Sequence, residues 1–195
     1  MQGAYRVYHR GIAFTRRYPL IRGMLSYAAI WPVGSCIQQC ITDGKRSWEE
    51  IDLARAARFS LFGSCYVAPT LYAWIKLSST MWPASTLSSA ITKALVEQFS
   101  YGPAAMISFF FGMSLLEFKG FSAAATEVSD KFWPTYKVGV CVWPIVQTIN
   151  FTLISERNRV PFVSICSLIW TTFLSFMKQA DPEIARKTGL LPLEK

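Results

Sequence analysis

The sequence has few charged residues: only 16% of its 195 residues are Asp, Glu, Lys or Arg, while 52% are hydrophobic. A soluble domain usually carries about 25% charged residues. The chain therefore lacks the polar surface of a soluble protein of this length. The segments between its apolar stretches are too short and too polar to build a core of their own, so we expect no separate soluble domain.

The residues that most catalytic and metal sites require are also scarce. The single histidine, His9, lies in the basic N-terminal segment, so no Ser/His/Asp set with a usable histidine can form. No glycine-rich phosphate loop occurs, and the five cysteines lie in apolar stretches without a C-x-x-C pair. We therefore expect no enzyme, no catalytic residues, no cofactor and no metal site. We expect the cysteines to be buried and to act as small apolar side chains.

Acidic residues are missing from the start of the chain, where the first acid is Asp43. Residues 1–22 contain five arginines and one histidine instead. A basic, acid-free start of this kind resembles an organelle targeting segment. A helix lying on anionic lipid explains the same pattern, and the two interpretations are compatible.

Two long stretches without a charged side chain dominate the C-terminal half. Residues 138–155 and 160–177 are 18 residues each, close to the length that crosses a hydrocarbon core as a helix. A short polar break at 156–159 separates them, and together they predict a transmembrane helical hairpin. Further uncharged windows at 23–42, 59–75 and 98–116 bring the candidate spans to five.

We therefore predict an all-α integral membrane bundle with four to five transmembrane helices over residues 23–178. The basic segment 1–22 precedes it, and a disordered tail over 179–195 follows it. The polar stretch 117–137 is expected to form a short interfacial helix that ends at Trp133-Pro134.

The net charge of +8 is explained by loop residues at lipid headgroups. Nucleic acid is not an expected partner, because no basic stripe interleaved with aromatics lies outside the apolar windows.

Small residues at four-residue spacing predict a packing face within the window 98–116. Ala104, Ser108 and Gly112 form this ladder, and small side chains allow helices to approach closely in lipid. Outside the windows, Ser47 and Glu50 have the spacing of a capping box, which predicts a helix start.

Amide side chains inside the predicted spans are candidates for function. An amide in hydrocarbon must find a partner, because no water satisfies it there. One interpretation is that the amides line a polar path for small solutes. The other is that they bond across helices and only hold the bundle together. Under the first interpretation the pore-lining residues are Gln38, Gln98, Gln147 and Asn150.

Glu97, Trp143 and Pro144 are predicted to gate or shape this path. Trp143 lies on one helical stripe with Gln147 and Asn150, and Pro144 can kink its helix. An acid at the edge of a span is costly unless it is hydrated or paired, so Glu97 predicts a weak cation bias or a protonatable gate. The alternative for Glu97 is an ion pair with Lys93, one helical turn earlier.

Three blocks of residues carry a family resemblance. They are Trp143-Pro144, Gln147, Asn150-Phe151, Arg159-Val160 and Trp170 to Leu174-Ser175; Lys93, Glu97-Gln98 and Pro103; and Asp52, Arg55, Arg58, Gly63, Pro69 and Trp74. These blocks resemble the Mpv-type membrane proteins of mitochondria and peroxisomes, which include the twenty-two-kilodalton peroxisomal membrane protein. The segments 16–19 and 132–137 look closest to the Mpv-like branch, and the match covers roughly residues 16–178.

The chain departs from the family pattern at two places. Ser35 stands where the family usually has Asp after Gly34, and Tyr72 stands where it usually has His after a Gly-Pro pair. If the missing Asp and His take part in gating or conduction, this chain conducts differently from its relatives or not at all.

The resemblance implies a multi-span protein of the mitochondrial inner membrane, or alternatively of the peroxisomal membrane, and the basic start favours the mitochondrion. It implies a weakly selective channel or passive transporter for small solutes, linked to reactive-oxygen metabolism and mitochondrial homeostasis. The alternative is a non-conducting scaffold that recruits antioxidant or mitochondrial gene-expression factors. The expected partners are the lipid bilayer and small solutes or metabolites, and a homo-oligomer is left open.

Overall fold

The computed structural model describes residues 18–41, 43–84, 86–154 and 156–179, and at 147, 148, 150–152, 156–161, 163 and 164 it describes the backbone alone. Within these residues every regular element is helical. The elements are α2 (Pro19–Ile41), η1 (Trp48–Glu50), α3 (Leu53–Phe62), η2 (Gly63–Val67), α4 (Ala68–Met81), α5 (Leu87–Phe99), α6 (Tyr101–Leu116), α7 (Phe121–Thr152) and α8 (Glu156–Gln179). The segments 1–17 and 180–195, which hold most of the predicted basic start and tail, lie outside the described residues.

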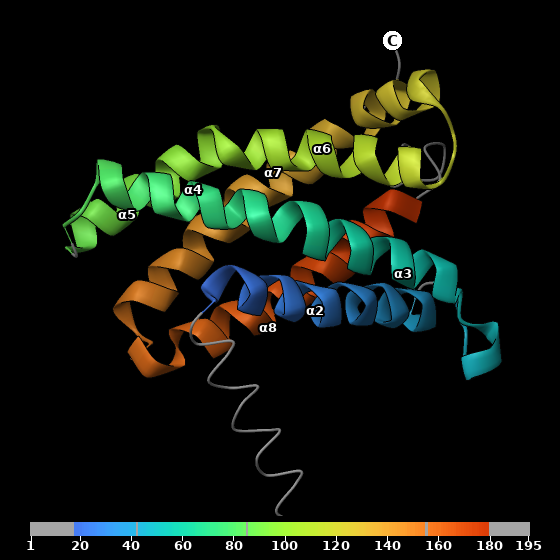
Figure 1. The fold of residues 1–195 in the computed structure, drawn as a ribbon, viewed down its shortest axis with the longest axis horizontal. Helices are drawn as coiled ribbons and strands as arrows, with labels where there is room; N and C mark the ends of the chain where they lie inside the picture. Colours follow the sequence, from blue (N-terminus) through green and yellow to red (C-terminus); the bar gives the residue numbers. More distant parts are fainter. Residues whose placement is uncertain (1–17, 42, 85, 155, 180–195) are drawn as a thin grey trace, which may run out of the picture.

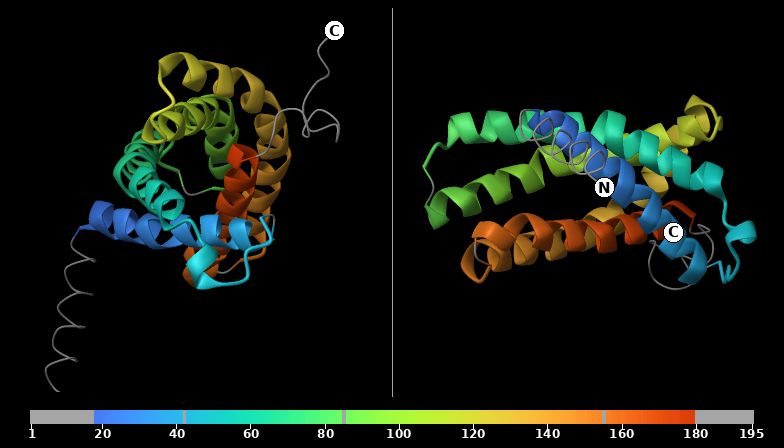
Figure 2. Two further views of the ribbon diagram at one scale, coloured as in Figure 1. Left: turned by 90° about the vertical axis from the view of Figure 1, so that its right-hand side faces the viewer. Right: turned by 60° about the horizontal axis from the view of Figure 1, so that its bottom comes forward.

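The described helices form a bundle of rods that alternate in direction (Figure 1). α3, η2 and α4 form one rod, α5 and α6 form another, and α2, α7 and α8 form one each. An end view shows the rods grouped around a common axis, with α2 crossing at the side (Figure 2). The α2–α3 connection, the α6–α7 turn and the end of α8 share one end of the bundle, here named the α2–α3 end (Figure 1). The α4–α5 and α7–α8 connections lie at the opposite, α4–α5 end.

Two of the described helical segments are long and apolar enough to cross a membrane by length and composition: Pro19–Ile41 and Leu87–Leu116. The second joins α5 to α6 and begins earlier than the predicted window 98–116. The prediction of an all-helical bundle is confirmed, and two of its predicted spans meet this criterion.

The predicted helix end at Trp133-Pro134 is wrong. α7 continues from Phe121 to Thr152 through both Pro134 and Pro144, so the predicted interfacial helix and the predicted span 138–155 are parts of one helix. A proline removes a backbone hydrogen bond from a helix and can kink it without ending it. Pro134 and the next residue, Thr135, are both buried, so packing holds the helix across this point.

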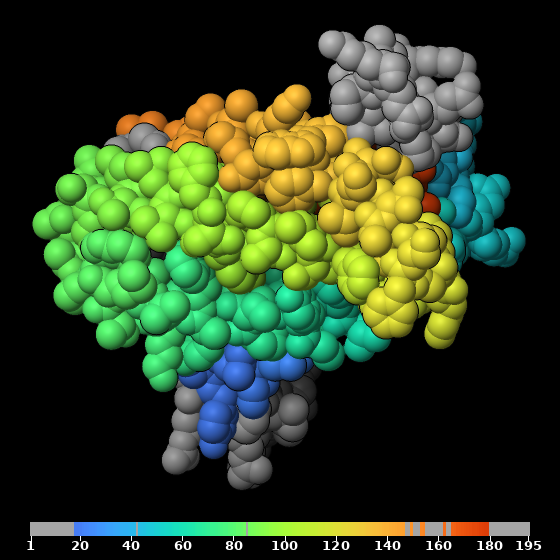
Figure 3. Space-filling view, turned by 90° about the horizontal axis from the view of Figure 1, so that it is seen from above, coloured from blue at the N-terminus to red at the C-terminus, as the bar shows by residue number. Residues whose placement is uncertain are grey.

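Large apolar side chains cover much of the outer surface of the bundle. They include Leu25, Val33, Leu61, Ile75, Leu95, Ile107, Ile145 and Ile169. Figure 3 shows one face of this surface, formed by α4, α5, α6 and α7. Exposed apolar area on this scale is expected of a surface that meets lipid or a partner rather than water. Cys40, Cys65 and Cys141 also lie on the exterior, so the expectation that all cysteines are buried is wrong for these three.

Four rings from three rods form the centre of the core. Trp31, Phe59, Phe62 and Phe109 lie with ring centroids 5.7–6.2 Å apart, and we refer to them as the aromatic cluster. Tilted and edge-to-face contacts at such distances are favourable for aromatic pairs. The cluster ties α2, α3 and α6 together in the middle of the bundle.

A widened helical turn accommodates Pro69. At η2 the backbone N–H of Ala68 donates to the carbonyl of Gly63, five residues earlier. A π-helical turn of this kind relieves the clash between a proline ring and the preceding turn. Gly63 also allows the indole of Trp31 to approach, since a Cβ there would lie 2.6 Å from Trp31 Cγ.

The predicted small-residue ladder faces the α3–α4 rod at two of its three positions. The hydroxyl of Tyr66 donates to Ser108 Oγ at 2.8 Å, and a Cβ at Gly112 would lie 2.6 Å from Phe62 Cε2. Ala104 is exposed instead. The predicted capping box at Ser47 and Glu50 is confirmed, although the helix that it starts is the single turn η1.

We predict that Gly34→Ala destabilises the bundle by about 1–3 kcal/mol, because overpacking forces shifts in well-packed neighbours. A Cβ at Gly34 would lie 2.5 Å from Thr171 Oγ1 and 3.1 Å from the backbone nitrogen of Thr172. Chemical unfolding of the purified protein in detergent micelles measures the loss. Gly23→Ala is the matched control on the same helix, since no atom lies within 4 Å of a Cβ there. It should be neutral or up to about 1 kcal/mol more stable, and equal effects of the two variants would contradict the close α2–α8 contact.

Candidate functional site

A cavity of about 500 Å³ lies inside the bundle, and residues from every rod line it. This volume lies within the roughly 300–1,000 Å³ range of small-molecule sites. Among the polar side chains in the lining are Lys93, Glu97 and Gln98. The rest of the wall is largely apolar and aromatic.

One face of the α5–α6 rod forms the longest wall. Its lining residues are Ala90, Lys93, Ala94, Glu97, Gln98, Tyr101, Gly102, Ala105, Met106 and Phe109. They repeat every three or four residues, which is the spacing of a single helix face. At 1.5 Å per residue this stripe is about 28 Å long, close to the roughly 30 Å thickness of the hydrocarbon core of a bilayer.

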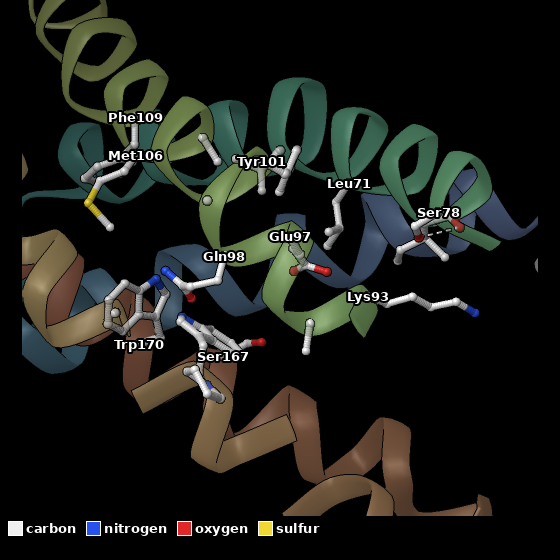
Figure 4. A pocket seen from close by; sticks show the side chains of 18 of the residues that line it. Leu71, Ser78, Lys93, Glu97, Gln98, Tyr101, Met106, Phe109, Ser167 and Trp170 are labelled. Carbon is white, nitrogen blue, oxygen red and sulfur yellow. Dashed lines mark hydrogen bonds between the residues drawn. The ribbon is translucent and has the colours of Figure 1, made fainter. Parts of the chain in front are cut away.

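α8 and α7 supply the facing wall. Ser167, Trp170, Thr171 and Leu174 line the cavity from α8, and Gly139, Trp143 and Pro144 line it from α7. Figure 4 shows Trp170 and Ser167 facing the side of α5 that carries Glu97 and Gln98. Gly139 leaves room for Trp170, since a Cβ there would lie 3.3 Å from the indole. The indoles of Trp143 and Trp170 meet edge to face at 5.8 Å.

The cavity reaches the surface at the α4–α5 end. Ser78 and the exposed Ser79 line it there from the last turns of α4. Lys93 lies at the same end on α5, and its side chain extends away from Glu97 (Figure 4). Lys93 therefore lies nearer to this open end of the cavity than Glu97 does.

The aromatic cluster closes the other end of the cavity. Trp31 and Phe109 belong to the lining, and the rings of Phe59 and Phe62 pack against both of them. Beyond these rings Phe110 and Met113 are fully buried. The cavity therefore ends near the middle of the bundle.

Glu97 faces the cavity without a cation beside it. Among the described residues its one hydrogen bond comes from Trp74 Nε1 on α4, 3.2 Å from Glu97 Oε2. Glu97 and Lys93 do not form the ion pair that was the alternative prediction. The Gln98 side chain also lines the cavity and makes no hydrogen bond within the described part of the chain. The side chains of these two adjacent residues thus make a single hydrogen bond within the described part of the chain.

A seam of hydrogen bonds fixes the wall that carries Glu97. Besides the Trp74 contact, the hydroxyls of Thr70 and Tyr101 share a hydrogen bond of 3.0 Å. The rings of Trp74 and Tyr101 stack with centroids 5.9 Å apart. The hydroxyl of Tyr136, from α7, donates to the backbone carbonyl of Gln98 at 2.9 Å. These contacts hold the α5–α6 rod against α4 and α7 and orient the carboxylate.

Gln38 lies outside the cavity lining, at the α2–α3 end. Its amide donates to Asp43 Oδ1 at 3.1 Å and accepts from Ser175 Oγ of α8 at 3.2 Å. Arg55 Nη1 pairs with Asp43 Oδ2 at 2.8 Å. We refer to these four residues as the Gln38 network. Its contacts match the second interpretation of the amides, in which they join helices. The adjacent Gln39 is likewise bonded, to Lys45 and to the backbone of Asp52.

A second polar network lies at the same end, around a lysine whose side chain is 0% exposed. Lys178 Nζ on α8 lies 2.7 Å from Glu127 Oε2, 3.0 Å from Glu117 Oε2 and 2.9 Å from Ser114 Oγ. Lys131 pairs with Glu127 at 3.0 Å, and Lys119 pairs with Glu117 at 2.8 Å. We refer to these six residues as the Lys178 network. It joins α6, α7 and α8 behind the aromatic cluster.

The Lys178 network also shifts the titration of its central acid. Burial alone raises the pKa of Glu127, but hydrogen bonds from Lys178 and Ser114 and the charge of Lys131 outweigh it. The net result lowers the pKa of Glu127 to about 2. Burial lowers the pKa of Lys131 despite the neighbouring carboxylate. Glu127 is thus held as a carboxylate across the physiological range.

The structure brings together four of the predicted site residues: Gln98, Glu97, Trp143 and Pro144 all line the cavity. Gln147 and Asn150 fall on α7 after Trp143, but their side chains lie outside the described residues. The role of each residue in conduction stays a prediction.

Sequence reasoning missed Tyr101, Ala105, Met106 and Phe109 as lining residues. Their three- and four-residue spacing from Gln98 could have identified them. Among the described residues, no group of three His, Cys, Asp or Glu side chains could hold a metal ion.

The fold and the site define a class: an all-helical bundle with an apolar exterior and an internal cavity that opens at one end. The comparisons give the family. The chain is 32% identical to the Mpv17-like protein of Xenopus laevis over 170 residues, which cover 87% of this chain and 82% of the relative. It is also 32% identical to the Mpv17-like protein of Bos taurus, over 84% of this chain and 80% of the relative. Residues 114–175 match the Mpv17 / PMP22 family. The chain belongs to this family of membrane proteins.

A further relative bears on location. The chain is 26% identical, over 86% of its length and 93% of the relative, to the Mitochondrial inner membrane protein Mpv17 of Caenorhabditis briggsae. The predicted location in the mitochondrial inner membrane is confirmed at the level of the family. No solved structure matches the chain at a significant level.

We predict that acid weakens the Lys178 network. A carboxylate whose folded pKa is lowered contributes stability above its unfolded pKa of about 4.3, and this contribution is lost as the pH falls towards the folded value. Lowering the pH from 5 to 2 should therefore remove up to about 3 kcal/mol from the unfolding free energy through Glu127. Unfolding in detergent micelles across this pH range measures it.

Glu127→Gln is the test variant for this prediction, and Asp130→Asn, on the same helix outside the network, is the control. The Glu127→Gln variant should lose less stability than the wild type between pH 5 and 2, because it no longer titrates at this position. The Asp130→Asn variant should follow the wild type. Parallel curves for Glu127→Gln and wild type would refute the coupling of Glu127 to this network.

Proposed function

We propose that the protein is a weakly selective channel or passive transporter for small solutes in the mitochondrial inner membrane, in a closed state. The observation that carries this proposal is the cavity lined by one continuous face of the α5–α6 rod. Residues from every rod line it, and it holds an amide and a carboxylate that forms no ion pair within the described part of the chain. A path for polar solutes needs such groups to converge on one axis inside the bundle.

In this proposal the bundle crosses the membrane four to five times. The two apolar segments Pro19–Ile41 and Leu87–Leu116 span it, together with the α3–α4 rod and the hairpin of α7 and α8. The length of the lining stripe, about 28 Å by helix rise, supports an axis that runs along the membrane normal. Trp48 at the α2–α3 end, 81% exposed, and Trp82 at the α4–α5 end suit the interfacial positions that tryptophan favours.

The closed end of the proposed path is the aromatic cluster and the two networks behind it. Conduction requires Trp31 and Phe109 to separate, because their rings fill the axis between the cavity and the α2–α3 end. Hydrophobic constrictions of this kind gate channels by excluding water.

The scaffold alternative differs in what it needs from the polar side chains. A scaffold requires amides and charges only to be paired, as Gln38 and Lys178 are. Glu97 and Gln98, which face a cavity instead, favour the solute path. A non-enzymatic role, and a link to reactive-oxygen metabolism and mitochondrial homeostasis, are part of this proposal.

We predict that Ala105→Phe reduces solute flux by roughly tenfold or more, because a phenyl ring would occupy part of the cavity. Ala105 lines the cavity. Ala104→Phe is the matched control, since the neighbouring side chain points to the exterior and should leave flux unchanged. The measurement is single-channel recording in planar bilayers, with release of small solutes from liposomes beside it.

The two variants should unfold at similar temperatures, which separates a blocked path from a misfolded protein. Flux that both variants reduce equally would contradict a path through this cavity. A folded wild-type protein that conducts nothing in either assay would favour the scaffold.

A further inference from the structure

Glu97 is a carboxylate that has no counter-ion among the described residues, in a cavity whose lining is largely apolar and aromatic. Its Oε2 accepts the Trp74 indole N–H at 3.2 Å, and no lysine or arginine of the described chain pairs with it. This differs from the Lys178 network, where each carboxylate has a lysine within 3.0 Å. A carboxylate in low dielectric is costly unless a cation balances it.

The surrounding wall suits an organic cation. Tyr101 lies one helical turn from Glu97, and Trp31, Trp143 and Trp170 line the same cavity. Aromatic faces attract ammonium groups, most strongly where water is excluded. The cavity volume of about 500 Å³ admits a small molecule with an apolar body.

A bare metal ion fits this site less well. Hard cations such as Ca²⁺ take six or more oxygen ligands, and Glu97 provides the one carboxylate of the lining. Lys93 stands at the mouth, but its side chain extends away from Glu97 (Figure 4). It therefore does not neutralise the carboxylate in this state.

From this arrangement we propose that the cavity binds protonated organic amines, with the ammonium group on Glu97 and the apolar part against the aromatic wall. The assignment deepens the proposed function, on which it rests for the access of solutes to the cavity. Gln98, beside Glu97 in the lining, is placed to accept a further ammonium hydrogen bond.

The test is calorimetric titration of the full-length protein in lipid nanodiscs with three probes of one shape: phenethylammonium, 2-phenylethanol and phenylacetate. Empty nanodiscs correct for partition into lipid. The wild type should bind the ammonium probe roughly tenfold more tightly than the alcohol, as a charge-assisted hydrogen bond and cation–π contact predict. Phenylacetate should bind no better than the alcohol.

Glu97→Gln is the decisive variant, because its amide oxygen can still accept the Trp74 hydrogen bond. It should bind the ammonium probe and the alcohol equally. Asp130→Asn, which removes a carboxylate at the opposite end, should keep the wild-type preference. A preference that survives Glu97→Gln, or equal binding of the two probes to the wild type, would overturn the assignment. Tighter binding of phenylacetate would also overturn it, by pointing to Lys93.

These outcomes are independent of the test of conduction. Glu97-dependent amine binding in a protein that conducts nothing would contradict the proposed channel and support the amine site. If Ala105→Phe blocks flux but the wild type shows no preference for the ammonium probe, the amine site is contradicted and the channel is supported.

Discussion

The buried ammonium group of Lys178 is the interaction on which the arrangement of this bundle depends. Its side chain is fully enclosed, so its charge must be balanced inside the protein, and removal of one partner of such a pair costs about 3–5 kcal/mol. Glu117 and Glu127 balance it from the end of α6 and from α7. Much of α8 is apolar and could slide along its neighbours, but a shift of one turn would leave this lysine unpaired. One turn earlier, Ser175 donates to Gln38 of α2. The last turns of α8 therefore set the register of four helices.

The cavity and the two polar networks lie in different halves of the bundle, and the pairing of polar groups differs between these halves. At the α2–α3 end amides and charges bind one another across helices, so no cavity is needed to hydrate them. At the other half Glu97 and Gln98 share a face of α5. Among the described residues Glu97 has only the Trp74 indole of α4 as a hydrogen-bond partner, and the Gln98 side chain has none. A polar group that is neither paired nor hydrated is unfavourable in an apolar interior. The cavity lies beside Glu97 and Gln98, and under the proposed function these two side chains are the polar groups that a solute would meet.

The helical class was predictable from the sequence, because long uncharged segments that lie in lipid must satisfy their own backbone hydrogen bonds, and a helix does so within one segment. The ends of the helices were harder to predict. Pro134 suggested a break, but burial of the surrounding turn holds α7 together. Glu97 and Gln98 were predictable as site residues, because an acid and an amide at the edge of a span are unfavourable unless they are paired or hydrated. The placement of Gln38 was not predictable, because its partner Ser175 is 137 residues away. The lining stripe was not predicted for a different reason: most of its residues within the window 98–116 are apolar or aromatic, and such residues at helical spacing are equally expected of a packed core.

Under the proposed function, movement of α2 would extend the cavity without separating a charge pair of Lys178. This helix contributes Trp31, the ring that both lines the cavity and packs on Phe59 and Phe109. Its last turns are fixed by the Gln38 network, whereas the Lys178 network lies on other helices and does not hold it. A swing of α2 about its anchored end would withdraw Trp31 from the axis without breaking any ion pair of Lys178. Aromatic contacts are each worth about 0.5–1.5 kcal/mol beyond burial, less than a broken buried charge pair. The path is therefore expected to open by displacing rings rather than by separating charges.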